Sequence, residues 1–166
     1  MSSSSSPALV FGVAGEQGRA VLEGLLDDGK YEPIYGFTSQ ALDNDSDQYL
    51  TDALGCILLQ GELSNPSDVR KALSSTRATA IFLVTTTDFA AGDVSYATAQ
   101  EDEYDTIMQF FTILKEVYQQ DGLERTVIFS TRDNVQELCR QEFDATGEEW
   151  IAPLDDGSIV PHYSGK

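Results

Sequence analysis

Short apolar runs alternate along the chain with stretches in which apolar residues recur at helical spacing. The apolar runs have the length of buried strands and occupy residues 8–11, 33–38, 56–60, 79–85 and 126–130. Helical spacing follows the first run, recurs after Asn65-Pro66, and extends over about residues 100–120. Continuous apolar strands that alternate with helices are typical of a parallel sheet covered on both faces. We therefore expect an α/β fold with a three-layer, doubly wound parallel sheet of about five strands.

Local signals predict several helix ends. Gly29 follows the first helical stretch, and glycine is common just after a helix, where the backbone often adopts the left-handed conformation. Asn65 can cap the second helix, and Pro66 suits its first position because that N–H would have no partner. A further helix is predicted over residues 134–143. In the longest helix we expect one apolar stripe to pack in the core, formed by Tyr104, Ile107, Met108, Phe111, Leu114 and Tyr118.

Domain organisation follows from the two ends of the chain. Residues 1–7 are serine-rich and have no basic or long apolar region, so we expect a disordered lead-in and no secretory signal. Residues 8–166 suffice for one domain with its own core. No apolar run has the length of a membrane span. We therefore expect a cytoplasmic protein, with access to the nucleus as well.

The net charge of −18 limits the classes of partner. Repulsion from phosphate argues against direct nucleic acid binding and against acidic membranes. The acidic residues are dispersed, which favours a role in solubility and leaves a basic protein partner as the alternative. Residues 43–47 lack the glycine and glutamate of an EF-hand calcium loop. Cys56 and Cys139 are expected to be small buried hydrophobes, and with the single His162 they make no zinc site, so no metal is expected.

A glycine-rich turn between the first strand and the first helix is the strongest candidate site. Gly12 lets the chain turn off the strand, and Gly18 lets the helix pack against the sheet. Gly15 lets a diphosphate approach the backbone where the helix N-terminus offers N–H groups and a partial positive charge. Strand, turn and helix together predict dinucleotide binding. The alternative is an ordinary strand-to-helix turn without a ligand.

The ligand crevice of a doubly wound sheet lies at the carboxyl ends of the strands. We expect that edge to bring the glycine turn together with Thr38-Ser39, Glu62-Leu63 and Thr85-Thr86. Residues that are far apart in the sequence would then contribute to one Rossmann-like site.

These positions also carry a family pattern. Residues 12–18 are similar to a GATGxQG-like turn, and Gly61-Glu62-Leu63 to a GDL-like motif. Residues 127–130 are similar to a strand that ends FSS, and residues 160–166 to an HFDSK-like motif. In these motifs the chain resembles the NmrA-like family, whose members are atypical short-chain dehydrogenases/reductases, from about Ala8 to its last residue.

The resemblance implies a Rossmann fold that binds NAD or NADP. It also implies a role as a redox sensor or regulator that works through protein contacts, although other members of the family are reductases. In this family the turn binds the diphosphate, the GDL-like motif lies near the adenine, and the final lysine reaches the nicotinamide ribose. The implied cofactor-binding residues are Gly12, Ala14, Gly15, Glu16, Gln17, Gly18, Ser39, Glu62, Leu63, Thr85 and Lys166.

Departures from the family pattern leave the choice between NAD and NADP open. Members that prefer NADP often carry an arginine just after the second strand, where this chain has Ser39 and Gln40. Neither side chain offers a cation to a 2′-phosphate, and neither is a carboxylate that would hold a free 2′-hydroxyl. We expect little advantage for NADP over NAD, with Arg19 as the nearest other cation.

The catalytic signature of a short-chain reductase is incomplete. That signature is Tyr-x-x-x-Lys, whose two residues share one helix face. Here Tyr163 stands three residues before Lys166, and His162 stands four before it. We therefore expect no catalytic residue and interpret the chain as a nucleotide-binding sensor or regulator. The alternatives are a reductase that uses Tyr163 and Lys166, and an interaction module that binds no nucleotide.

The resemblance stops within the HFDSK-like region, so we expect an incomplete family member. The strand at residues 126–130 would then lie at the edge of the sheet. Uncovered apolar edges favour self-association, which predicts a chain that is either marginally stable or a homo-oligomer, unless residues 133–161 cover this strand.

Overall fold

The structure is a computed structural model that describes residues 5–39, 50–51, 55–85 and 96–130. The chain divides into two compact units, one of residues 1–86 and 108–130 and the other of residues 87–107 and 131–166. In the second unit only the helical residues 96–107 are described. The sheet and all described candidate site residues belong to the first unit.

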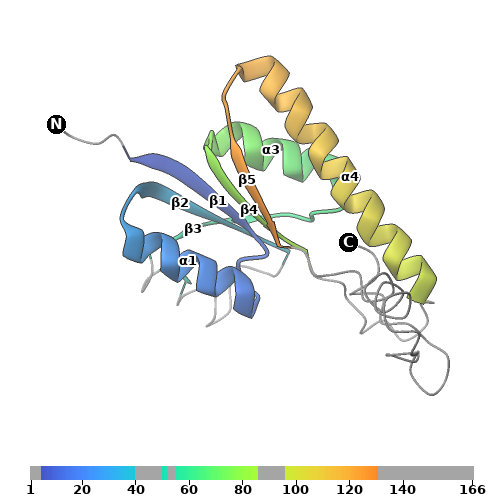
Figure 1. Ribbon diagram of the computed structural model, residues 1–166, viewed down its shortest axis with the longest axis horizontal. Helices are drawn as coiled ribbons and strands as arrows, with labels where there is room; N and C mark the ends of the chain where they lie inside the picture. Colours follow the sequence, from blue (N-terminus) through green and yellow to red (C-terminus); the bar gives the residue numbers. More distant parts are fainter. Residues whose placement is uncertain (1–4, 40–49, 52–54, 86–95, 131–166) are drawn as a thin grey trace, which may run out of the picture. The chain divides into compact units, whose positions relative to one another are not determined.

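The described strands form one parallel sheet in the order β3-β2-β1-β4-β5 (Figure 1). The strands are β1 (Ser6–Phe11), β2 (Tyr31–Thr38), β3 (Ile57–Gln60), β4 (Ala80–Val84) and β5 (Thr126–Ser130). The chain runs outward from β1 to β3 and then crosses to the other side of β1 for β4. The strand order therefore reverses at β1, which confirms the predicted doubly wound α/β sheet.

The described helices are α1 (Glu16–Asp28), α3 (Pro66–Thr76) and α4 (Tyr96–Asp121). Both predicted boundary signals are confirmed. Gly29 ends α1 in the left-handed region, with φ of 65°. Asn65 caps α3, where its side-chain oxygen accepts a hydrogen bond from the Ser67 N–H at 3.0 Å.

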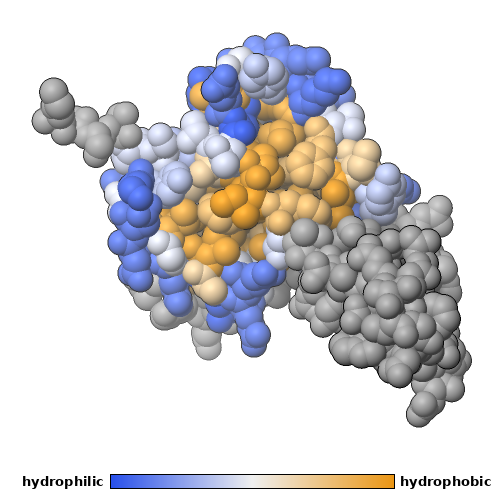
Figure 2. Space-filling model, viewed as in Figure 1, coloured by the Kyte–Doolittle hydropathy of each residue, from blue (hydrophilic) through white to orange (hydrophobic). Residues whose placement is uncertain are grey.

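The strand β5 is at one end of the described sheet, beside β4. Its Ile128 is 52% exposed, and Phe111 and Tyr118 of α4 are 37% and 48% exposed. Figure 2 shows apolar surface in the middle of this face of the molecule, where Figure 1 places β4 and β5. Among the described residues, the part of the sheet around β5 is therefore only partly covered.

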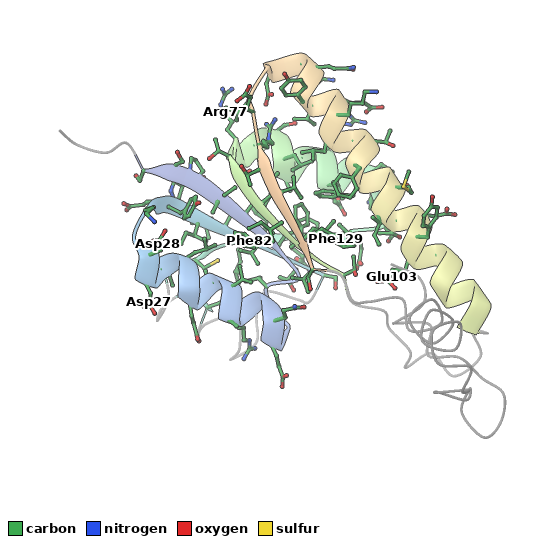
Figure 3. The ribbon with its side chains drawn as sticks, in the orientation of Figure 1. Asp27, Asp28, Arg77, Phe82, Glu103 and Phe129 are labelled. Atoms are coloured by element: carbon green, nitrogen blue, oxygen red, sulfur yellow. The ribbon has the colours of Figure 1, made fainter. Side chains whose placement is uncertain are left out.

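Side chains on the two faces of the sheet form two separate clusters. Leu9 and Phe11 of β1 join Phe110 and other residues of α3 and α4 on one face. Ala8 and Val10 of β1 join Leu22 and other residues of α1 on the opposite face. The outer strands also contribute to both faces. Phe82 of β4 packs against the cluster that contains α1, and Phe129 of β5 packs against the cluster that contains α3 and α4 (Figure 3). Helices thus cover both faces, as predicted for a three-layer fold.

The predicted core stripe of the longest helix is partly wrong. The buried residues of this helix include Ile107, Phe110, Ile113 and Val117. Of the predicted stripe, Ile107 is buried and Leu114 is partly buried. The remaining four are exposed, namely Tyr104, Met108, Phe111 and Tyr118. The reason is that α4 carries apolar residues at two overlapping helical spacings, and only one of them faces the sheet.

Among the described residues, none of the helices combines the length and the apolar character that a membrane crossing requires.

Candidate dinucleotide site

The glycine turn leaves the end of β1 and is fastened to the neighbouring strand. The N–H groups of Gly12 and Val13 both donate to the Phe37 carbonyl of β2, at 3.0 and 3.4 Å. The Gly15 N–H donates back to the Gly12 carbonyl at 3.1 Å, which closes the turn. The Val13 side chain is fully buried, and a Cβ on Gly36 of β2 would lie only 2.7 Å from it. The turn is therefore fixed by β1 and β2 before any ligand binds.

Packing within the protein explains two of the three glycines. Gly12 has φ of 78°, and a Cβ there would lie 2.8 Å from the Val84 carbonyl oxygen of β4. A Cβ on Gly18 would lie 2.2 Å from the Gly12 carbonyl oxygen, closer than two such atoms can approach. Both positions therefore need glycine so that the strand can turn and the helix can pack closely.

Gly15 has no such reason in the described part of the chain. Its φ of −79° suits any residue, and among the described residues a Cβ would meet only the Gly12 oxygen, at an ordinary 3.5 Å. Gly15 is also the N-cap residue of α1, and having no side chain it cannot cap this helix end itself. The first turn of α1 thus begins beside an open backbone position. This geometry suits a diphosphate.

The other predicted residues follow the carboxyl ends of the neighbouring strands. Ser39 comes directly after β2 and is exposed, and Thr85 comes directly after β4 and is buried. Glu62 and Leu63 follow β3, where the Gly61 N–H donates to the Thr38 carbonyl at 3.0 Å. One edge of the sheet therefore carries all of these positions. Tyr163 and Lys166 lie outside the described residues, as do Cys139 and His162.

Two further side chains contact the loop of Gly61–Asn65 and were not anticipated from the sequence. Asp68 Oδ2 accepts from the Glu62 N–H at 3.0 Å, and Gln109 Nε2 donates to the Ser64 carbonyl at 3.1 Å. The contact of Asp68 could have been predicted from the sequence nearby, because an acid in the first turn of a helix often binds a preceding N–H group. The contact of Gln109 could not, because this residue comes from α4, far away in the sequence.

Comparison with known proteins decides the family. The model of the NAD dependent epimerase/dehydratase family matches residues 8–154. The chain belongs to this family. The family is NAD dependent, so the expectation of a nicotinamide dinucleotide cofactor, NAD or NADP, is confirmed at the level of the family. No curated protein matches the chain.

Solved structures share the fold at low identity. ADP-L-glycero-D-manno-heptose-6-epimerase from Helicobacter pylori is 14% identical with a TM-score of 0.62, over 98% of this chain and 48% of that one. A wide-type short-chain dehydrogenase/reductase from Veillonella parvula in complex with NADP is 13% identical with a TM-score of 0.59, over 96% and 59%. An isoflavone reductase is 19% identical with a TM-score of 0.52, over 87% and 47%. The chain spans about half the length of these structures.

The charges near the turn of this epimerase/dehydratase family member are mixed. Arg19 is partly buried in the first part of α1, and its buried Nε has no hydrogen-bond partner among the described residues. Glu16 stands in the first turn of the same helix and is exposed. A phosphate group would gain from Arg19 and from the helix N-terminus, whereas Glu16 opposes it from the solvent side.

No group of metal-ligand side chains accompanies this site in the described part of the chain. The nearby Cys56 thiol is buried against β2, as expected of a small hydrophobe, and burial raises its pKa to about 11. A thiol with this pKa is protonated at neutral pH and is a poor nucleophile.

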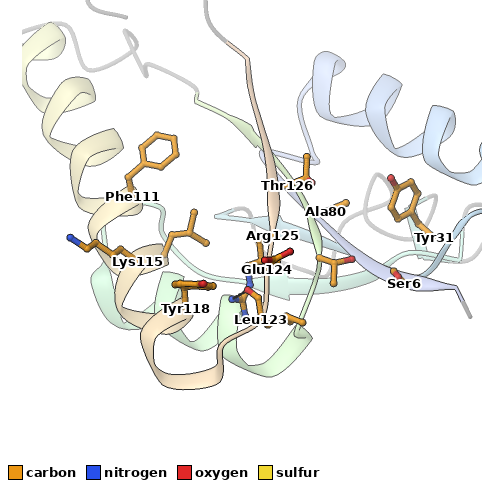
Figure 4. Close-up of a pocket in the computed structure, with 12 residues that line it drawn as sticks. Ser6, Tyr31, Ala80, Phe111, Lys115, Tyr118, Leu123, Glu124, Arg125 and Thr126 are labelled. Atoms are coloured by element: carbon orange, nitrogen blue, oxygen red, sulfur yellow. Dashed lines mark hydrogen bonds between the residues drawn. The ribbon is translucent and has the colours of Figure 1, made fainter.

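A groove of about 860 Å³ lies at the other end of the strands, where β1, β2, β4 and β5 begin. Its walls include Ser6, Tyr31 and Thr126 at the starts of three strands, and Phe111 and Tyr118 of α4 (Figure 4). Of the candidate cofactor residues that the structure describes, none lines this groove. Ligands of doubly wound sheets bind at the carboxyl ends of the strands, so this groove is separate from the dinucleotide site of the family.

Proposed function

We propose that this family member is NmrA-like, binds NAD or NADP at the turn of residues 12–18, and acts as a redox sensor or regulator. The proposed contacts are the eleven residues that the resemblance implies, with Lys166 at the nicotinamide ribose. Gly15 supports the site most directly, because packing among the described residues gives no reason for its missing side chain. The absence of dehydrogenase turnover rests on the three-residue spacing of Tyr163 and Lys166.

Titration calorimetry with NAD, NADH, NADP and NADPH tests the binding. A sensor is expected to bind with micromolar affinity and to distinguish the oxidised from the reduced form. NAD and NADP are expected to bind about equally, since Ser39 gives no cation to the 2′-phosphate. If none of the four binds, the chain is an interaction module without nucleotide.

Turnover distinguishes the sensor from the reductase. The purified chain is expected to show no oxidation of NADH or NADPH with aldehydes, ketones or quinones. Steady turnover that Tyr163→Phe abolishes would establish the reductase. Tyr31→Phe is the matched control, since Tyr31 lies at the start of β2, away from the carboxyl edge of the sheet.

Regulation requires a partner, and the proposal includes two. One is a protein that the nucleotide-bound chain contacts in the cytoplasm or nucleus, and the net charge of −18 favours a basic surface on it. The other is a second copy of this chain, supported by the exposed Ile128 on β5. The charge also supports the absence of direct nucleic acid binding.

A further inference from the structure

The loop of Gly61–Asn65 is held by side chains from α3 and α4, two helices that carry none of the proposed cofactor contacts. We propose that Asp68 and Gln109 are positioning residues that hold this loop for the adenine end of the dinucleotide. The inference rests on the proposed function, which assigns Glu62 and Leu63 to the adenine. It extends that function to α3 and α4.

Asp68 fixes the backbone at Glu62. Its carboxylate Oδ2 accepts the Glu62 N–H at 3.0 Å, and a bond to an ionised acceptor is stronger than a neutral one. The loop also closes on itself, because the Asn65 N–H donates to the Glu62 carbonyl at 3.0 Å. Both backbone groups of Glu62 therefore have fixed partners, while its side chain is exposed and available to a ligand.

The crowding around Gly61 shows that this arrangement is built into the packing. A Cβ on Gly61 would lie 2.8 Å from the Phe37 ring and 2.9 Å from Asp68 Cβ. Asp68 thus packs directly over the Gly61 backbone. Only glycine at this position lets the Asp68 carboxylate reach the next N–H group.

Gln109 fixes the other end of the loop. Its Nε2 donates to the Ser64 carbonyl at 3.1 Å, from a residue 45 positions away in the sequence. The neighbouring ion pair of Arg70 with Glu116 joins α3 to α4. Because neither partner of that ion pair belongs to the loop, the pair provides a control for the general packing of the two helices.

The test compares affinity for NAD with affinity for its hypoxanthine analogue, which differs only in the adenine ring. Asp68→Ala is expected to weaken NAD binding about threefold to tenfold and to lower the ratio of the two affinities. Asp68→Asn keeps an oxygen acceptor and is expected to restore most of the ratio. Gln109→Met keeps the length of the side chain without the donor and is expected to lower the ratio about twofold.

Glu116→Gln is the control and is expected to leave the ratio unchanged. A structural defect alone would weaken both ligands equally, so equal weakening by Asp68→Ala and Gln109→Met would overturn the inference. Exchange of the Glu62 amide proton provides a second measurement, expected to be faster in Asp68→Ala. If the unmodified chain binds no dinucleotide, the proposed function itself fails. If it binds NAD but the two variants weaken both ligands equally, only the inference about Asp68 and Gln109 fails.

Discussion

The three glycines of the turn are glycine for different structural reasons. Gly12 and Gly18 are required by the protein's own backbone, whereas Gly15 has room for a side chain. The same G-x-x-G-x-x-G spacing thus combines two glycines that the fold needs with one that the described packing does not need. The roles of Gly12 and Gly18 were predicted correctly from the sequence, whereas the role of Gly15 in binding a diphosphate stays a prediction. Only the geometry around each Cα separates the three positions.

The glycine variants follow from this difference. Gly18→Ala is expected to destabilise the fold by about 2–4 kcal/mol, because the new methyl group overlaps the backbone. Gly15→Ala is expected to keep the stability within about 0.5 kcal/mol and to weaken dinucleotide binding about tenfold. Chemical denaturation and calorimetry measure the two effects.

Gly24→Ala is the matched control, because Gly24 lies in the same helix with nothing within 4 Å of a new Cβ. It is expected to stabilise α1 slightly and to leave binding unchanged. Unaltered affinity in Gly15→Ala and in the larger Gly15→Val would refute the site assignment.

At the scale of elements, the connection from α4 to β5 depends on one charged pair. The Arg125 side chain is 3% exposed and donates to both oxygens of Asp121. Asp121 also accepts the Leu123 N–H at 2.9 Å, and Arg125 donates to the Leu123 carbonyl at 3.0 Å. These hydrogen bonds hold the pKa of the Asp121 carboxyl at about 2.

Asp121→Asn is expected to lower the melting temperature at pH 7 by a few degrees, since Arg125 loses its charged partner. A depressed carboxyl pKa adds stability above the unfolded value near ~4 and loses it as the pH falls through about 2. The difference between the variant and the unmodified chain should therefore shrink from pH 5 to pH 2.

Asp28→Asn serves as the comparison for that experiment. Its partner Lys30 is 75% exposed, and such surface pairs contribute little. An equal loss of stability in Asp28→Asn and Asp121→Asn would show that the buried geometry of Arg125 is unimportant.

The elements themselves were largely predictable from the sequence, for identifiable reasons. The β5 strand was predicted at its observed bounds because a short apolar run ends at polar residues on both sides. The buried face of α4 was not, because Phe110 and Phe111 are equally apolar and only the position of the sheet distinguishes them. Likewise, Gln109 reaches Ser64 only after α4 has packed, so no local pattern indicated this part of the site.

At the scale of the molecule, the first unit leaves β5 at one end of the described sheet with Ile128 half exposed. We expect the purified chain to self-associate, because apolar edge regions pair readily. Ile128→Lys is expected to shift the sedimentation profile toward the monomer. Leu26→Lys, on α1 and outside both end strands of the sheet, is the control, since Leu26 is also an exposed apolar residue at 36%. A monomer at all concentrations in the unmodified chain would refute this prediction.

The central place of β1 has a consequence for how the chain is made. The strand is synthesised before β4, which is one of its two neighbours in the sheet, and Thr79 contacts Pro7 across 72 residues. At about 5–20 residues per second, that neighbour arrives about 4–14 s later. During this interval an apolar strand has one side open in a growing chain, so we expect β1 to be prone to aggregation until β4 has been made.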